Sequence, residues 1–245
     1  MLRTLKEMIR HLIALSGLSK LYVRFRQFRG QNVRHLSLNS LKDRFSAAYK
    51  NGVWLNDRST GSLSGFGSEL ENTRKLRQAL PAILTALGTR TLLDLGCGDF
   101  GWMKEVQLPC RYIGADIVPE LIGENADLYG SEMRAFRELD ATSAPLPKAD
   151  TVLCREMLFH LSFNDIWRVI DNLHDSGVSF LIATSDNALR LNADILSGDF
   201  RSLNLSKAPF HFPKPKAVIE DNQVAQDRIL AVWEVSSLPR PRNKQ

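Results

Sequence analysis

Residues 91–102 read Thr-Leu-Leu-Asp-Leu-Gly-Cys-Gly-Asp-Phe-Gly-Trp, a short apolar run followed by three glycines. The apolar run predicts a buried strand over 91–95, and the glycines predict a tight turn where a ligand can approach the backbone. Gly96, Gly98 and Gly101 also satisfy the dinucleotide-binding pattern, but that match alone is weak. Asp94 changes the interpretation, because a carboxylate just before the turn would repel a pyrophosphate and attract an ammonium group.

Strand and helix signals alternate along the rest of the chain. Apolar runs predict further buried strands over 112–115, 151–154 and 180–184, with a weaker one over 136–139. Helical spacing lies between several of them, most clearly over 164–173. This alternation implies a parallel sheet covered on both faces, and right-handed crossovers make it a doubly wound α/β fold.

A helix is also expected upstream of the first strand, over residues 69–87. Ser68 is its expected N-cap, and Gly88 is its expected stop. Pro81 lies inside this range, so we expect it to kink or split the helix.

Two more carboxylates end the neighbouring predicted strands. Asp116 follows Asp94 by 22 residues, and Asp140 follows Asp116 by 24. Because parallel strands end at one edge of a sheet, Asp116 could accept both hydroxyls of a ribose and Asp140 an adenine amino group. For each residue the alternative is a helix N-cap, but the shared spacing favours one ligand site. S-adenosylmethionine carries all of these groups, together with an ammonium and a sulfonium.

The segment 94–98 resembles the class I S-adenosylmethionine-dependent methyltransferases, and the resemblance extends over residues 70–235. Segments 64–68, 98–103, 153–162 and 198–205 are similar to those of a bacterial group within that superfamily. The resemblance implies a seven-stranded, mostly parallel, Rossmann-like sheet with a final antiparallel hairpin, in which 228–235 is the inserted last strand. One departure is Phe100, which stands where the superfamily has a third glycine. The expected cofactor-binding residues are Asp94, Gly96, Cys97, Gly98, Asp116, Ile117, Asp140 and Ala141, with no metal ligand assigned.

Glu156 and His160 follow the fourth predicted strand, where residues of the superfamily face the methyl group and the substrate. Four residues apart, they would share one face of a helix, so His160 could act as a base that Glu156 orients. The alternative is that His160 packs in the first helical turn, while Glu156 holds the cofactor's ammonium or a backbone amide. Alignment and desolvation can also accelerate methyl transfer without a base.

Residues 187–215 are polar, rich in Asn and Pro, and too irregular for a helix. A segment of this length in a compact domain is usually functional, so we expect a lid that faces the substrate, with a solvated surface loop as the alternative. Its hydrogen-bonding groups would suit a polyhydroxylated or anionic acceptor. They are Arg190, Asn192, Asp194, Asp199, Arg201, Asn204 and His211.

The basic residues lie mainly at the two ends of the chain. Residues 1–34 hold eight Lys or Arg against one Glu, whereas the body between 35 and 239 is mildly acidic. Residues 2–15 predict an amphipathic basic helix, which would dock on an anionic membrane or acidic partner, or pack on its own protein. Tyr22, Phe25 and Phe28 lie between arginines and could stack on bases or on a lipid headgroup, but we expect them to anchor the helix. We expect a basic helical extension over 1–50, a methyltransferase domain over 51–239 and a basic tail over 240–245.

Length and composition exclude further classes of protein. The chain of 245 residues is 44% hydrophobic and has no apolar run long enough to span a membrane. We also expect no secretory signal, and the three cysteines fit a reducing cytoplasm.

These features together predict methyl transfer to an oxygen of a polar small-molecule or glycan-type acceptor, in the cytoplasm or peripherally at the inner face of the membrane. The alternatives are a nucleic-acid methyltransferase, which the acidic body argues against, and a non-catalytic S-adenosylmethionine-binding module. A nicotinamide dehydrogenase fits least, because Asp94 is wrongly placed for a pyrophosphate. The oligomeric state is not predicted.

Overall fold

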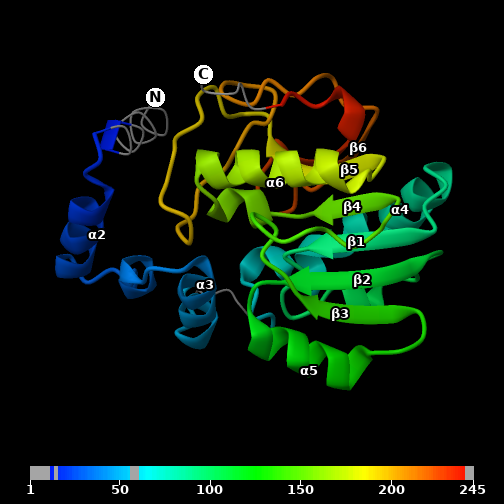
Figure 1. The fold of residues 1–245 in the computed structure, drawn as a ribbon, viewed down its shortest axis with the longest axis horizontal. Coiled ribbons are helices and arrows are strands. Elements are labelled where there is room, and N and C mark those ends of the chain that lie inside the picture. The colour runs from blue at the N-terminus through cyan, green and yellow to red at the C-terminus, as the bar shows by residue number, and fades with distance from the viewer. Residues whose placement is uncertain (1–11, 14–15, 56–60, 241–245) are drawn as a thin grey trace.

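A seven-stranded sheet forms the centre of the computed structural model, which describes residues 12–13, 16–55 and 61–240 (Figure 1). The strand order is β3-β2-β1-β4-β5-β7-β6. The first five strands pair in parallel, and β7 pairs antiparallel with both β5 and β6. The predicted doubly wound sheet with an inserted last strand is therefore confirmed. The strands are β1 Thr91–Leu95, β2 Arg111–Asp116, β3 Arg134–Glu138, β4 Thr151–Cys154, β5 Phe180–Asp186, β6 Ala217–Glu220 and β7 Arg228–Glu234.

Helices cover both faces of this sheet, and α4 and α6 lie on opposite faces (Figure 1). A hydrophobic core lies on each face of the sheet, and alternate residues of β1 pack into one or the other. Leu93 and Leu95 pack with α6, whereas Leu92 packs with α4. The described α-helices are α2 Ser19–Phe28, α3 Leu41–Lys50, α4 Leu70–Ala86, α5 Pro119–Tyr129 and α6 Phe163–Ser176. Short 3-10 helices are η1 Arg34–Ser37, η2 Phe66–Ser68, η3 Met103–Glu105, η4 Met157–His160 and η5 Val235–Ser237. No helix in the described part of the chain is long and apolar enough to span a membrane.

Helix α4 differs from its prediction in two ways. Its N-cap is Glu69, which makes no side-chain capping bond, and Ser68 lies in η2 instead. The helix also runs without a break through Pro81, because Leu76, Leu80 and Leu84 bury one continuous face against the sheet. The predicted stop is confirmed, since Gly88 takes a left-handed φ of 66° directly after the helix.

Phe100 occupies the position at which the superfamily pattern has glycine. Its φ is 55°, so a phenylalanine adopts the left-handed conformation that glycine takes without cost. The side chain is buried and its ring lies 5.1 to 5.2 Å from the rings of Tyr112, Tyr129 and Phe136. Packing of this aromatic ring offsets the backbone strain, which explains how the turn closes without the third glycine.

The N-terminal region is helical where the structure describes it. Most of the predicted amphipathic helix over 2–15 lies outside the described residues. Helix α2 is held to the body by buried Val23 and by an ion pair from Arg26 to Asp199. The expectation that aromatics anchor this helix is wrong for Phe25 and Phe28, because both side chains point into solvent.

Residues 187–215 contain no helix or strand, as predicted, but much of their polar surface is internal. Asn192 donates to the carbonyl oxygens of Asn204 and Ala208 at 2.9 and 2.8 Å. Arg201 is buried and donates to three carbonyl oxygens, those of Ala193, Leu158 and Leu161. These donors stabilise an irregular backbone in the interior, where unpaired carbonyls would be costly.

Candidate functional site

An open cavity lies at the carboxyl ends of β1, β2 and β4. The strand register sets Asp94 beside Gly114 of β2 and Leu153 of β4, so the ends of these strands form one edge. The cavity is lined by all but one of the predicted cofactor-binding residues, namely Asp94, Gly96, Cys97, Asp116, Ile117, Asp140 and Ala141.

Gly98 is the exception, because it does not line the cavity. Its amide donates to Oδ2 of Asp116 at 3.1 Å, and its φ is 58°. A Cβ atom added there would lie 2.2 Å from Oγ of Ser64 and 2.9 Å from the hydroxyl of Tyr49. Packing against these two side chains therefore requires a glycine at this position.

The three strand-end carboxylates are held differently. Asp116 accepts from the amides of Gly98 and Val118, each at 3.1 Å, and Asp140 accepts from the amide and hydroxyl of Thr142 at 2.9 and 2.7 Å. None of the three is the N-cap of a described helix, because Val118 caps α5 and Ser162 caps α6. The N-cap alternative is therefore wrong.

Asp94 is the most deeply buried of these three carboxylates. Its one hydrogen bond comes from the Tyr112 hydroxyl at 2.8 Å. Burial raises the pKa of Asp94 to about 7, although the Tyr112 bond and the charge of Arg155 both act to lower it. A buried carboxylate with a neutral hydrogen-bond donor is suited to a ligand that brings a positive charge.

Aromatic side chains form the opposite side of the cavity, and we call Phe45, Tyr49, Trp54 and His160 the aromatic wall. The ring centroid of Trp54 lies 4.7 Å from that of Tyr49, 5.1 Å from that of His160 and 6.1 Å from that of Phe45. Phe45 and Tyr49 come from α3, on the side of the sheet to which the strand arrowheads point (Figure 1). Their place in the cavity could not be predicted from the sequence, because a spacing of four residues indicates a helix face and nothing that links this face to β1.

His160 lies in η4 and is oriented by a backbone group. Its Nδ1 is 3.0 Å from the carbonyl oxygen of Asp199. Since a carbonyl can only accept, Nδ1 carries the proton and Nε2 has a free lone pair. Burial lowers the pKa of His160 to about 4, so the ring is neutral at pH 7. The prediction that Glu156 orients this ring is wrong, because the two residues are not on an α-helix and Asp199 holds the ring.

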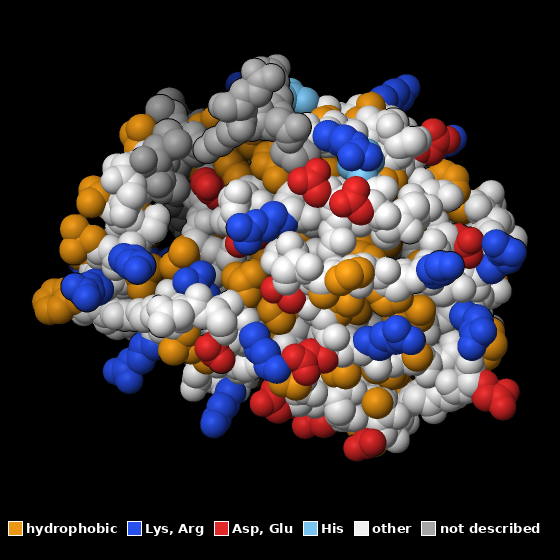
Figure 2. Space-filling model, viewed as in Figure 1, with side chains coloured by type: hydrophobic (Ala, Val, Ile, Leu, Met, Phe, Trp, Pro, Cys, Tyr) orange, Lys and Arg blue, Asp and Glu red, His pale blue; other side chains and the backbone are white. Residues whose placement is uncertain are grey.

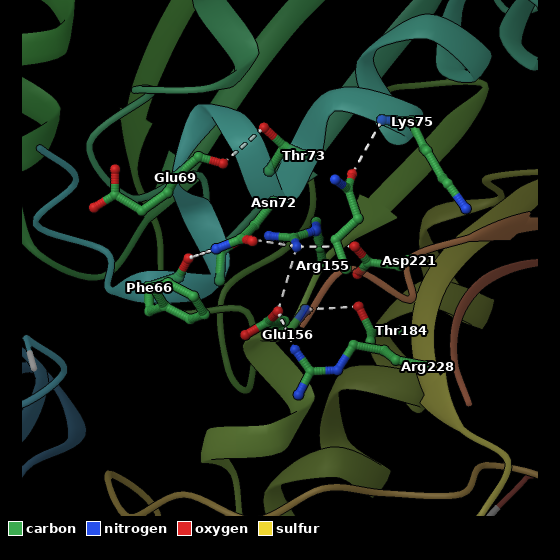
Figure 3. A network of polar contacts seen from close by, with 12 residues as sticks. Phe66, Glu69, Asn72, Thr73, Lys75, Arg155, Glu156, Thr184, Asp221 and Arg228 are labelled. Carbon is green, nitrogen blue, oxygen red and sulfur yellow. Dashed lines mark hydrogen bonds and ion pairs between the residues drawn. The ribbon is translucent and has the colours of Figure 1, made fainter. Parts of the chain in front are cut away.

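Glu156 belongs to a buried network of charges (Figure 3). Its Oε1 lies 2.6 Å from Nη1 of Arg228 and 3.4 Å from Nη2 of Arg155. Arg155 also contacts Asp221 at 3.1 Å and the Gly67 carbonyl at 2.9 Å. Burial acts to raise the pKa of Glu156, but the two arginines bring it below its usual value. Glu156 is thus ionised at neutral pH, and it lies on the cavity wall.

Residues 187–215 contribute no side chain to the lining of this cavity. The prediction of a lid that faces the substrate is therefore wrong. The segment instead positions His160 from outside the cavity. The Asp199 carbonyl bonds to the His160 ring, and the amide of Gly198 donates to the His160 carbonyl at 2.8 Å. Arg44 and His35 in turn bond to the carbonyls of Ser197 and Gly198.

Comparison with known proteins gives one domain match and many similar folds. Residues 93–176 match the family model described as "Methyltransferase domain". The N-methyltransferase NodS of Bradyrhizobium japonicum WM9 is 15% identical with a TM-score of 0.54, covering 77% of this chain and 97% of its own. A 1,6-didemethyltoxoflavin-N1-methyltransferase of Burkholderia thailandensis is 16% identical with a TM-score of 0.53, covering 79% and 86%.

The magnesium protoporphyrin IX methyltransferase ChlM of Synechocystis PCC 6803, solved with bound S-adenosylmethionine, is 16% identical with a TM-score of 0.52, covering 80% of this chain and 97% of its own. No curated protein sequence matches the chain. Residues 93–176 therefore form a methyltransferase domain, and the seven-stranded sheet with its carboxylate-lined cavity has the fold of these methyltransferases.

Proposed function

We propose that this methyltransferase acts on an oxygen of a polar small-molecule or glycan-type acceptor, which it binds in the cavity between the carboxylate edge and the aromatic wall. The observation that carries the proposal is His160, a neutral imidazole whose Nε2 has a free lone pair and which shares the cavity with Asp94, Asp116 and Asp140. A hydroxyl acceptor needs a group that can take its proton, and this Nε2 supplies one.

The residues of the cavity fit S-adenosylmethionine. Asp94 suits its ammonium group, and Asp116 suits the ribose, because each carboxylate oxygen that accepts one backbone amide can accept a second donor. Asp140 is placed for the adenine amino group. A Cβ at Gly96 would lie 2.9 Å from Met157, so only glycine keeps this part of the turn open. The bound cofactor supplies a methyl group on a positively charged sulfonium.

The chain's own residues then act on the acceptor. The Asp199 carbonyl fixes the tautomer and orientation of His160, whose Nε2 accepts the hydroxyl proton. The aromatic wall offers flat apolar surface to the carbon face of a ring and excludes water from the reacting atoms. None of the polar side chains of 187–215 lines the cavity, and Asn192, Arg201 and Asn204 are buried, so this segment gives no support to a polar acceptor. The proposal therefore rests on His160 and on ionised Glu156.

Replacing His160 with glutamine tests the proton-accepting role. We expect the rate of transfer from radiolabelled S-adenosylmethionine to hydroxylated acceptors to fall about 100-fold or more, because the base is lost. The affinity for the cofactor, measured by calorimetry, should change less than about threefold, since cofactor contacts are intact.

His211→Gln is the matched control, because His211 is exposed and lies outside the cavity. The assay uses a panel of lipid-linked and free sugars, phenols and amines. Unchanged transfer in His160→Gln would contradict the role of His160, and methylation confined to amines would contradict the oxygen acceptor.

Cofactor binding should depend on pH through Asp94. Because burial holds the pKa of Asp94 near 7, the carboxyl keeps its proton in more acidic solution and must release it to pair with an ammonium group. We expect the affinity for S-adenosylmethionine to be about tenfold lower at pH 6 than at pH 7.5. Calorimetry in buffers of different ionisation enthalpy would measure the released proton.

Asp94→Asn is the control for this pH dependence, since an amide keeps the size of the protonated acid and its bond to Tyr112. Its binding should be weak and nearly independent of pH over this range. A variant that retained the full pH dependence would show that another group titrates.

We also propose that the protein works in the cytoplasm. Cys97, Cys110 and Cys154 are all unpaired and buried in the structure. Burial raises the pKa of each thiol, so all three are protonated and inert, as reduced structural cysteines are.

A further inference from the structure

One face of α2, together with its N-cap residue, carries large apolar side chains that are more than half exposed. Leu18, Leu21, Phe25 and Phe28, which we call the α2 stripe, are 51%, 61%, 56% and 88% exposed. Their spacing of three, four and three residues places them on one arc of the helix. Buried Val23 lies on the opposite side, so the helix turns its apolar stripe outward.

The rest of α2 is fastened to the body, which keeps the α2 stripe in this orientation. Val23 packs with Val33, Leu36 and half-buried Leu196. Nη1 of Arg26 lies 2.5 Å from Oδ2 of Asp199, and both side chains are largely shielded from solvent. The stripe is therefore presented by a packed helix.

The surroundings of the α2 stripe are basic. No Asp or Glu occurs between Glu7 and Asp43 in the sequence. Lys20, Arg24 and Arg29 are exposed beside the stripe. Figure 2 shows hydrophobic side chains projecting at the left edge, where α2 lies in Figure 1, with Lys and Arg side chains next to them. Exposed Leu and Phe flanked by Lys and Arg are the features of a helix that lies in a membrane interface.

We propose that the α2 stripe inserts into the headgroup region of an anionic membrane, while Lys20, Arg24 and Arg29 bind lipid phosphates. Each basic side chain near an anionic leaflet favours binding, and the apolar side chains add to it. A second copy of the chain is a poorer occupant, because stripe-to-stripe pairing would bring two sets of arginines together.

The position of α2 also relates the membrane to the cavity. Helices α2 and α3 lie on the side of the sheet to which the strands point, and α3 lines the cavity (Figure 1). Docking through α2 would therefore bring the cavity to the membrane surface. If the proposed function holds, this placement favours an acceptor whose hydroxylated group is attached to a lipid; the docking itself does not depend on that function.

Sedimentation of the full chain with lipid vesicles tests the proposal. We compare vesicles of phosphatidylcholine alone with vesicles that also contain phosphatidylglycerol, using the wild type and the variant Leu21→Ser, Phe25→Ser, Phe28→Ser. The wild type should partition at least about tenfold more strongly onto the anionic vesicles. The triple variant should lose at least about tenfold of that binding. The matched control is Leu128→Ser with Met133→Ser, which are 70% and 53% exposed outside α2 and should not change binding.

Three results would overturn the proposal. They are no binding of the wild type to anionic vesicles, equal binding by the triple variant and the wild type, and stripe-dependent self-association in sedimentation velocity without vesicle binding. Calorimetric titration with S-adenosylmethionine shows whether the triple variant is folded. Because this titration does not involve vesicles, failure of docking and failure of the methyltransferase site remain distinguishable.

Discussion

Replacing Arg201 with methionine should lower the free energy of unfolding by about 4 kcal/mol, a large part of the stability of a domain. The Arg201 side chain is 1% exposed. It donates from Nε to the Ala193 carbonyl at 3.1 Å, from Nη1 to that of Leu158 at 2.8 Å and from Nη2 to that of Leu161 at 2.6 Å. Methionine fills part of the space but leaves the buried carbonyls of Ala193 and Leu161 without the Arg201 donors, at roughly 1–3 kcal/mol each. The Leu158 carbonyl loses one donor and keeps the amide of Leu161.

Urea unfolding measures this loss as a lower midpoint at an unchanged slope. Arg190→Met is the matched control, because Arg190 lies in the same irregular segment but is exposed, and its change should stay within about 0.5 kcal/mol. Arg201→Lys should recover only part of the loss, since an ammonium lacks the planar fork of guanidinium. A loss below about 1 kcal/mol for Arg201→Met would mean that the Ala193 and Leu161 carbonyls find other partners.

Arg201 also shows why one part of the fold could not be predicted from the sequence. A run of Asn, Arg, Asp and Pro over 187–215 has the composition of a surface loop. Asn192 and Arg201 of this run are buried because their partners are backbone carbonyls, which every residue possesses and which leave no mark in the sequence. The same limit applies to His160, whose orienting partner is the main chain of Asp199.

The sheet and its carboxylates were predictable because they depend on local signals. The predicted bounds of β1 and β4 are confirmed, since short, continuous apolar runs with turn residues after them have few other structures. Asp94, Asp116 and Asp140 come together because parallel strands share one carboxyl edge. The aromatic wall depends instead on how α3 packs across that edge, which is a tertiary contact with no local signal.

Asp116→Ala should weaken S-adenosylmethionine binding at least about 100-fold, which corresponds to about 2.7 kcal/mol. The substitution removes both carboxylate oxygens proposed to accept the ribose hydroxyls. It also leaves the amides of Gly98 and Val118 without the acceptor that fixes the glycine turn. Calorimetric titration of the wild type and the variant measures the change, with Asp127→Ala as the control, because Asp127 is an exposed carboxylate of α5.

Two further measurements separate the causes of this loss. If the Asp116 carboxylate binds the ligand directly, Asp116→Ala should lose much less unfolding free energy than binding free energy. Urea unfolding without cofactor measures the loss of unfolding free energy. If the carboxylate mainly holds the glycine turn, the losses of unfolding and binding free energy should be similar, because the unpaired amides of Gly98 and Val118 would account for both. Titration of the wild type with NAD should show no binding, since Asp94 at the turn repels a pyrophosphate. Binding of NAD in place of S-adenosylmethionine would contradict the assignment of Asp94 as a carboxylate that repels a pyrophosphate and attracts an ammonium group.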